Sequence, residues 1–317
     1  MTDRKKQRLI SCSRSLGVGL VRAIFLISMC FVILYPILYM ISMAFRTAED
    51  IYDPTVIWIP KTFTTENFKE VFEMMDYFPK LLKTVEISVI ATILNVMICA
   101  FAGYGFARFR FKGKGLLFGF VLFTIIVPPQ SISIPMYIGY KNFDFLGIGT
   151  LIGYITGTPL TANLLNTDMV FYVPALLGAG IKSGLFIYIF RQFFRNLPKE
   201  LEDAACIDGC SIPRTYFNIM IPNARSSFVT CLLFSFVWYW NDYNAATMYF
   251  NEPRTLTASL SIINTLMKAN MYSSSNPFSM LLYRQCACLL CIIPLLIIYV
   301  FVQKFFTQSI ESSGIVG

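Results

Sequence analysis

The residue types that usually carry enzyme chemistry are missing or scattered in this sequence. The 317-residue chain contains no histidine, which excludes histidine-based metal sites, histidine acid–base catalysis and catalytic triads. Among its nine cysteines, Cys286, Cys288 and Cys291 form a close group, but no second pair follows at zinc-site spacing. Because the run around them is apolar, the sequence favours small packing residues in a membrane helix over a metal or redox site.

The sequence also lacks the residue patterns for ATP hydrolysis and for catalysis by paired carboxylates. The phosphate-binding pattern GxxxxGK[ST] is absent, so the chain is not expected to hydrolyse ATP itself. Glu86 and Asp242 are isolated carboxylates in distant parts of the chain, which disfavours a membrane-embedded enzyme such as a lipid-modifying transferase. No internal repeat is visible either, so a self-contained secondary carrier is disfavoured. We expect a protein that is not an enzyme.

The composition is that of a membrane protein with several spans. Apolar residues make up 56% and charged residues 14% of the chain, against roughly 45–50% and 25% in soluble domains. The net charge of +8 is typical of the basic excess that orients membrane proteins, and no nucleic-acid partner is expected. The basic N-terminal segment precedes an uncharged run from Ala23 to Phe45, which is longer than a cleaved signal requires.

Apolar windows predict an all-α polytopic fold with six transmembrane helices. Five of the windows contain no charged residue, and the window 169–190 contains only one, Lys182. The predicted spans are residues 23–45, 87–107, 115–140, 169–190, 226–241 and 285–303. The organisation expected from them is a cytoplasmic N-terminus at 1–22, a permease domain at 23–306 and a cytoplasmic tail at 307–317.

One uncharged window is not accepted as a span. In residues 145–167, twelve of the 23 residues are Gly, Thr, Pro or Asn, a poor composition for a helix facing lipid. We interpret the window as an extracytoplasmic loop or an interfacial hairpin. With six spans, 16 of the 26 Lys and Arg residues lie in the segments 1–22, 108–114, 191–225 and 304–317. The positive-inside rule then places both termini in the cytoplasm.

The predicted cytoplasmic loop 195–225 is read as a helix, a turn and a second helix. Asn196 is a candidate N-cap and Pro198 suits a first turn, while the acids that follow complement the helix dipole. Leu201, Ala204 and Ala205 share one face of the first helix, and Gly209 ends it. The second helix is capped by Ser211, starts at Pro213 and breaks at Pro222. This narrow face of small residues fits a groove on another protein; an ordinary helix resting on lipid headgroups is the alternative.

These residues resemble a known signature. Glu202-Asp203-Ala204-Ala205-x3-Gly209-x9-Ile219-x-Ile221-Pro222 is similar to the EAA–x3–G–x9–I–x–LP motif of ATP-binding-cassette importer permeases. The runs PKELEDAACIDGCS, WYWNDY, FTTENFKEVF and AGYGFARFRFKGKG resemble the maltose-type, carbohydrate-uptake group over most of the chain. The chain departs from the pattern at Asp203, Ile221 and Ser226. The segment 145–168 is also longer than the matching loop of typical members.

The resemblance implies the permease subunit of a type I importer in a bacterial cytoplasmic membrane. It implies a second homologous permease, two ATPase subunits that hold ATP and magnesium, an extracytoplasmic solute-binding protein and a sugar substrate; a non-sugar solute such as a polyol phosphate is the alternative. The outer loop at 249–283 and the tail at 309–317 are implied contacts with the binding protein and the ATPases. The implied ATPase-coupling residues are Glu202, Asp203, Ala204, Ala205, Asp208, Gly209, Ile219 and Pro222.

Polar and aromatic groups within spans are candidates for the substrate path. Lys182 falls roughly 13 Å from Arg191 along a helix, near the middle of the membrane. It is interpreted as a cation or gate facing a cavity, or else as the buried partner of a carboxylate on a companion subunit or a snorkelling side chain. The group at the end of the fifth span is either a sugar-binding lining or an aromatic belt with a helix cap. Pro128 and Pro129 predict a kink in the third span. The candidates are Lys182, Tyr188, Tyr239, Trp240, Asn241, Asp242, Tyr243 and Asn244.

Overall fold

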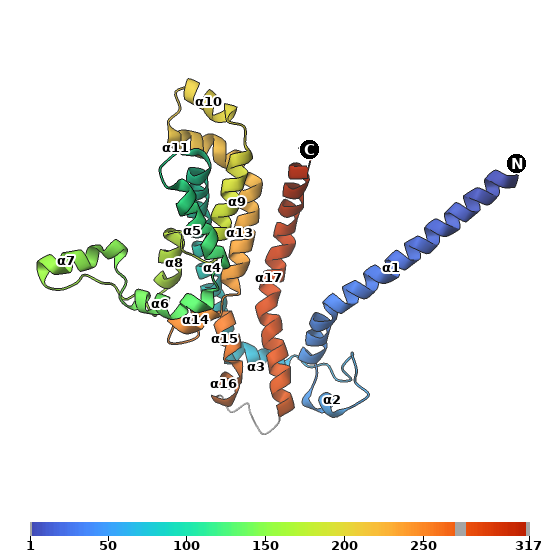
Figure 1. The fold of residues 1–317 in the computed structure, drawn as a ribbon. Helices are drawn as coiled ribbons and strands as arrows, with labels where there is room; N and C mark the ends of the chain where they lie inside the picture. The colour runs from blue at the N-terminus through green and yellow to red at the C-terminus, as the bar shows by residue number, and fades with distance from the viewer. Residues whose placement is uncertain (1, 270–276, 315–317) are drawn as a thin grey trace. The chain divides into compact units, whose positions relative to one another are not determined.

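A computed structural model describes residues 2–269 and 277–314 as an α-helical protein (Figure 1). In this part of the chain there is no strand, and one isolated antiparallel bridge joins Phe143 to Ala162. The α-helices are α1 (Thr2–Ala44), α2 (Ala48–Tyr52), α3 (Glu66–Met74), α4 (Tyr77–Arg108), α5 (Lys114–Ile126), α6 (Pro129–Lys141), α7 (Ile148–Thr156), α8 (Met169–Leu176), α9 (Ser183–Asn196), α10 (Glu200–Ile207), α11 (Ile212–Thr215), α12 (Ile221–Asn223), α13 (Arg225–Trp240), α14 (Asn244–Tyr249), α15 (Leu256–Ser261), α16 (Ile263–Ala269) and α17 (Pro277–Gly314).

Each of the six predicted spans coincides with one helix or one interrupted pair. Among the described residues, three helices are long and apolar enough to cross a membrane alone, at Gly17–Ala44, Tyr77–Arg108 and Met280–Lys304. Two bent pairs, α5 with α6 and Ile212–Asn223 with α13, raise the number to as many as five. The window 169–190 forms α8 and α9, two short helices with a break between them.

The third predicted span is not a straight helix. The axes of α5 and α6 meet at 107° around Val127 and Pro128. Neither Pro128 nor Pro129 has an N–H to donate to the preceding turn, so the helix stops and restarts rather than bending gently. The break predicted at Pro128 and Pro129 is therefore confirmed as a sharp kink.

The chain divides into two compact units, Met1–Met74 with Ile263–Leu290 and Met75–Ile262 with Cys291–Gly317. In the first, polar groups organise the segment after α1. Arg46 is buried, and its guanidinium donates to the carbonyl oxygen of Ile57 at 2.7 Å. The Asn67 amide donates to the carbonyl oxygens of Ala44 and Arg46 at 3.0 and 2.8 Å. These side chains supply hydrogen bonds to loop carbonyl groups, which have no partner in a helix or a sheet.

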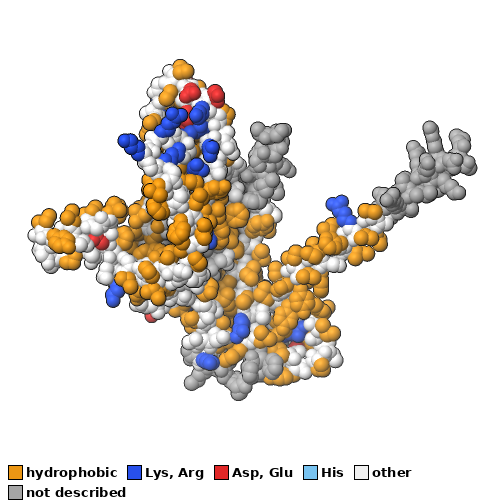
Figure 2. Space-filling view, viewed as in Figure 1, with side chains coloured by type: hydrophobic (Ala, Val, Ile, Leu, Met, Phe, Trp, Pro, Cys, Tyr) orange, Lys and Arg blue, Asp and Glu red, His pale blue; other side chains and the backbone are white. Residues whose placement is uncertain are grey.

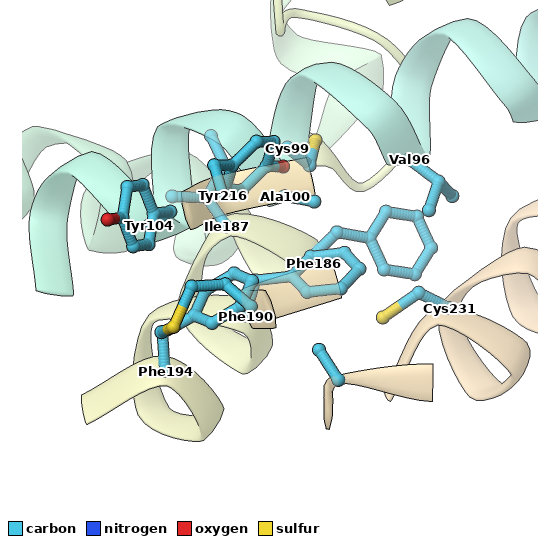
Figure 3. Packing of buried hydrophobic residues seen from close by; sticks show 12 residues of the cluster. Val96, Cys99, Ala100, Tyr104, Phe186, Ile187, Phe190, Phe194, Tyr216 and Cys231 are labelled. Carbon is cyan, nitrogen blue, oxygen red and sulfur yellow. The ribbon is translucent and has the colours of Figure 1, made fainter. Parts of the chain in front are cut away.

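In the second unit, α4 is the central helix and packs along α9, α13 and α8. Phe186, Phe190 and Phe194 repeat every four residues along α9 and are buried against α4 (Figure 3). The backbones approach closely at Gly103, where a Cβ atom would lie 2.6 Å from Phe190 Cβ. Glycine is therefore required at this crossing. The packed α4–α9 pair ends beside the predicted coupling loop.

Candidate functional site

The loop between α9 and α13 contains the helix that the sequence predicts, with a later start. Asn196 is the last residue of α9, so it does not cap α10 as expected. The chain turns at Leu197 and Pro198, and α10 begins at Glu200 with Lys199 in the N-cap position. Pro198 disfavours the helical conformation of the residue before it, Leu197. The break between α9 and α10 therefore falls at Leu197 and not at Asn196. The acids Glu200, Glu202 and Asp203 occupy the first turn of α10, as predicted.

Gly209 ends α10 as predicted. Its φ of +74° lies in the left-handed region, which a residue with a side chain enters only with strain. The turn allows the backbone N–H of Cys210 to donate to the carbonyl oxygen of Ala205 at 2.9 Å and that of Gly209 to the carbonyl of Cys206 at 3.0 Å. These bonds satisfy carbonyl groups that the end of a helix leaves free.

The second helix of the loop breaks later than predicted. Ser211 stands at the N-cap position of α11. Residues Tyr216–Met220 form a π-helical turn in which the N–H of Ile221 bonds to the carbonyl of Tyr216. Pro222 lies inside this continuous helix, and the bend of 79° comes where α13 begins, after Asn223. Since Pro222 has no N–H, the preceding turn widens instead of breaking.

Glu202 ties α10 to the end of α4. Tyr104 donates its hydroxyl to Glu202 Oε1 at 2.8 Å, and Arg108 Nε lies 3.2 Å from Glu202 Oε2. The same arginine donates to the carbonyl oxygen of Leu197 at 2.8 Å. Because the Arg108 and Glu202 side chains are only 7% and 20% exposed, the pair is shielded from water and interacts strongly. Glu202 therefore links two elements of this chain.

The surface that α10 presents to solvent differs from the predicted one. Asp203, Ala204, Asp208 and Gly209 are exposed, and Figure 2 shows acidic side chains at this tip, beside a group of Lys and Arg residues. Ala205 is buried in the chain itself, so the expected close approach of a partner at Ala205 does not hold. In the second helix of the loop, Ile219 is half-buried and Pro222 exposed.

Ile207 is the residue that sequence reasoning missed. Its side chain is 86% exposed at the C-terminal end of α10. A single exposed apolar side chain is common on protein surfaces, but Ile207 stands at the exposed tip of α10 and is therefore a candidate contact for another protein. Its position within the signature, between Ala205 and Gly209, could have identified it in the sequence. The prediction considered only the small residues of this helix.

Two predicted substrate-path aromatics lie in the core. The Tyr239 hydroxyl accepts a hydrogen bond from the backbone N–H of Ile181 at 3.2 Å, and Trp240 Nε1 donates to the carbonyl oxygen of Cys291 at 3.4 Å. Both rings are buried. This corrects the expectation that they offer faces to a sugar, because a ring enclosed by its own chain cannot stack on a ligand.

The residues after α13 remain at the surface. Asn241, Tyr243 and Asn244 are exposed, and Asp242 is half-buried. Asp242 accepts a hydrogen bond from the backbone N–H of Ala245 at 3.2 Å and so caps α14. Burial raises the pKa of Asp242, while the hydrogen bonds from Ala245 and Asn244 lower it. The bond from Ala245 lies at the start of α14 and not at the end of α13, so the sugar-binding and helix-cap interpretations of the group both stay predictions.

Lys182 lies in the break between α8 and α9 and not within a helix. Its φ is +57°, and it precedes the first residue of α9. Among the described residues, none forms an ion pair with Lys182, and pairing with a carboxylate of a companion subunit stays a prediction. Tyr188, further along α9, stacks on Phe118 with ring centroids 6.4 Å apart.

A buried polar group at this break was not predicted. Asn95 of α4 donates to the carbonyl oxygen of Ile181 at 3.0 Å and accepts from the Ser183 hydroxyl at 2.6 Å. Gly180 fits tightly beside it, since a Cβ atom there would lie 2.5 Å from the Tyr239 hydroxyl oxygen. These contacts satisfy backbone groups that the interrupted helix frees, as a membrane requires.

Within the group 286–291, Cys286 and Cys291 are buried packing residues. Cys286 is buried and donates to the carbonyl oxygen of Ala44 at 3.4 Å, and Cys291 contacts the carbonyl oxygen of Leu256 at 3.7 Å. Among the described residues, no three His, Cys, Asp or Glu side chains are grouped as a metal site requires.

Helices long and apolar enough to cross a membrane, together with a short helix on a charged loop outside them, define a polytopic membrane protein. Residues 96–312 match the family "Binding-protein-dependent transport system inner membrane component". The chain belongs to this family and is a permease of an ATP-binding-cassette importer. It is therefore a membrane protein with the type I permease fold.

Individual relatives agree over nearly the whole chain. It is 25% identical to the polygalacturonan/rhamnogalacturonan transport system permease protein YtcP of Bacillus subtilis, over 92% of this chain and 96% of that protein. It is 26% identical to the arabinooligosaccharides transport system permease protein AraQ of Halalkalibacterium halodurans, over 90% and 92%. A chain of a bacterial transporter involved in alginate import shares the fold, with a TM-score of 0.68, 19% identity and coverage of 92% and 98%.

Proposed function

We propose that this chain is the permease subunit of an ATP-driven importer of a sugar or oligosaccharide. Relatives that align with nine-tenths of the chain are named as transport permeases for polysaccharides and oligosaccharides. A lactose transport permease of Rhizobium radiobacter aligns over 89% of it. The exposed polar group Asn241, Tyr243 and Asn244 supplies hydroxyl-binding groups, and Lys182 is a second candidate on the path.

The proposal includes a separate ATPase that docks on α10. One observation carries this step: Glu202 joins α10 to α4 through Tyr104 and Arg108, so force on α10 passes directly into a membrane helix. The exposed tip, with Ile207, Asp203 and Asp208, is the contact surface. Closure of the ATPases then favours one state of the permease through differential binding.

The assembly we propose has four kinds of subunit. This permease pairs with a second, homologous permease, and two ATPase subunits bind ATP and magnesium, which this chain does not bind. An extracytoplasmic solute-binding protein delivers the sugar. Both termini, the loop 195–225 and the tail 307–317 lie in the cytoplasm of a bacterial cell, as the distribution of Lys and Arg supports.

An Ile207→Asp variant tests the docking surface. A carboxylate cannot be buried in an apolar contact without a large cost, so transport and ligand-stimulated ATP hydrolysis should fall at least tenfold in the reconstituted complex. The matched Ile207→Leu variant keeps an apolar side chain and should retain both. Wild-type stimulation of ATP hydrolysis in the aspartate variant would refute docking at α10.

A further inference from the structure

The segment between α6 and α8 folds into a hairpin that the importer mechanism does not use. Phe143 and Ala162 exchange two backbone hydrogen bonds at 2.8 and 2.9 Å and close its base. Helix α7 occupies one arm, and the chain returns past Pro159. In Figure 1 the hairpin extends sideways from the helices α4, α9 and α13. It leaves them nearer the end of this unit that lies opposite α10.

Several polar backbone groups of this hairpin form hydrogen bonds within it. Asp144 caps α7 by accepting from the N–H of Gly149 at 2.6 Å and that of Thr150 at 2.8 Å. At the other end, the N–H of Gly157 donates to the carbonyl oxygen of Gly153 at 2.8 Å. The N–H of Leu160 donates across the hairpin to Gly149 at 3.1 Å. Internal pairing is the condition for backbone to lie in an apolar medium.

The two arms touch through backbone and not through large side chains. A Cβ atom at Gly149 would lie 1.9 Å from the carbonyl oxygen of Leu160, and one at Gly153 would lie 2.7 Å from Pro159 Cα. Large side chains therefore have no space between the arms and point outward. Leu146, Tyr154 and Ile155 are 84–85% exposed. The other large apolar side chains exposed on the hairpin are Phe145, Ile148, Leu151, Ile152 and Leu160.

Charge and shape decide what covers this surface. Residues 145–167 contain no charged side chain, whereas protein contacts made by soluble partners have polar, charged rims. On α7, the side chains of Ile148, Leu151, Ile152 and Ile155 lie along one side of the helix, away from Gly149 and Gly153, which face the returning arm. A short helix with one apolar side is the form that lies in a lipid interface. The nine residues of α7 extend only about 14 Å, too short to span a bilayer.

We propose that the hairpin 143–162 lies in the lipid interface of the membrane and anchors the connection between α6 and α8. Its apolar side chains enter the acyl region, while Thr158 and Thr161, both exposed, reach the headgroups. The proposal rests on the membrane location of the family and is independent of docking at α10. Lipid is the proposed occupant of this surface, and contact with the second permease or with the binding protein is the alternative that the test distinguishes.

Photo-crosslinking in the assembled transporter tests this assignment. p-Benzoylphenylalanine in place of Tyr154 is activated in vesicles of phosphatidylethanolamine and phosphatidylglycerol, and adducts are identified by mass. We expect adducts to acyl chains. The same probe in place of Ile207 should give an adduct to the ATPase, so that failure of the two proposals can be distinguished. A protein adduct at Tyr154, or no adduct at all, would overturn lipid anchoring.

A matched pair of charges sharpens the test. Ile155→Asp places a carboxylate on the apolar surface and should strongly reduce the lipid adduct formed at Tyr154. Thr158→Asp adds the same charge at the polar turn and should leave the yield unchanged. In both variants the probe at Ile207 reports whether the complex is assembled. Equal yields at Tyr154 in assembled complexes of the two variants would also contradict the proposal.

Discussion

Two short helices stand outside the main bundle of this permease, and their surroundings are opposite. Helix α10 has eight residues and α7 has nine. The first turn of α10 holds three acids, and a shielded ion pair secures it to α4. Helix α7 and its flanks contain no charge from 145 to 167, and Asp144 secures it locally. The length of a short helix therefore does not indicate whether it lies against protein, water or lipid. The distribution of charge around the helix does.

The largest effect should come from breaking the ion pair that secures α10. Arg108→Met leaves Glu202 partly buried without its cation, which costs about 3 kcal/mol when a buried pair is broken. We expect a lower unfolding temperature and loss of ligand-stimulated ATP hydrolysis, with the lipid adduct at Tyr154 unchanged.

Two variants serve as controls for the ion pair. Arg110→Met removes an exposed arginine two residues away and should behave as the wild type. The Arg108→Met/Glu202→Met double variant should recover much of the stability, because neither charge is then unpaired. Additive losses in the double variant would show that the two side chains do not interact.

A smaller effect is expected where α10 ends. Gly209→Ala adds a methyl group with nothing within 4 Å, so only the left-handed backbone is strained, at a cost of about 1 kcal/mol. Thermal unfolding of the purified complex measures this cost. Gly105→Ala, at an ordinary helical position of α4 with its nearest contact at 3.8 Å, should be neutral or slightly stabilising. An equal loss in both variants would contradict the role given to Gly209.

Much of this fold can be predicted from sequence because apolar runs and helix-end residues act locally. The six windows, the stop at Gly209 and the break at Pro128 depend only on neighbours in the chain. The contact of Tyr104 with Glu202 joins residues 98 positions apart, and no local pattern reports it. Likewise α13 is apolar on every side, so periodicity could not show that Tyr239 and Trp240 face inward.

The smallest expected effect concerns the cap of α7, the counterpart of the ion pair at α10. Hydrogen bonds from Thr150 and Gly149 lower the pKa of Asp144 below its ordinary 3.8. A lowered pKa means that the charged cap stabilises the hairpin above that value and is lost as the pH falls through the lower, folded pKa. Asp144→Ala should therefore speed amide exchange at Gly149 and Thr150 at neutral pH. Asp203→Ala at α10 is the matched control and should leave exchange at these amides unchanged. Because the Asp144 cap is local, the variant should keep full ligand-stimulated ATP hydrolysis, and a loss of that stimulation would show that the hairpin takes part in coupling.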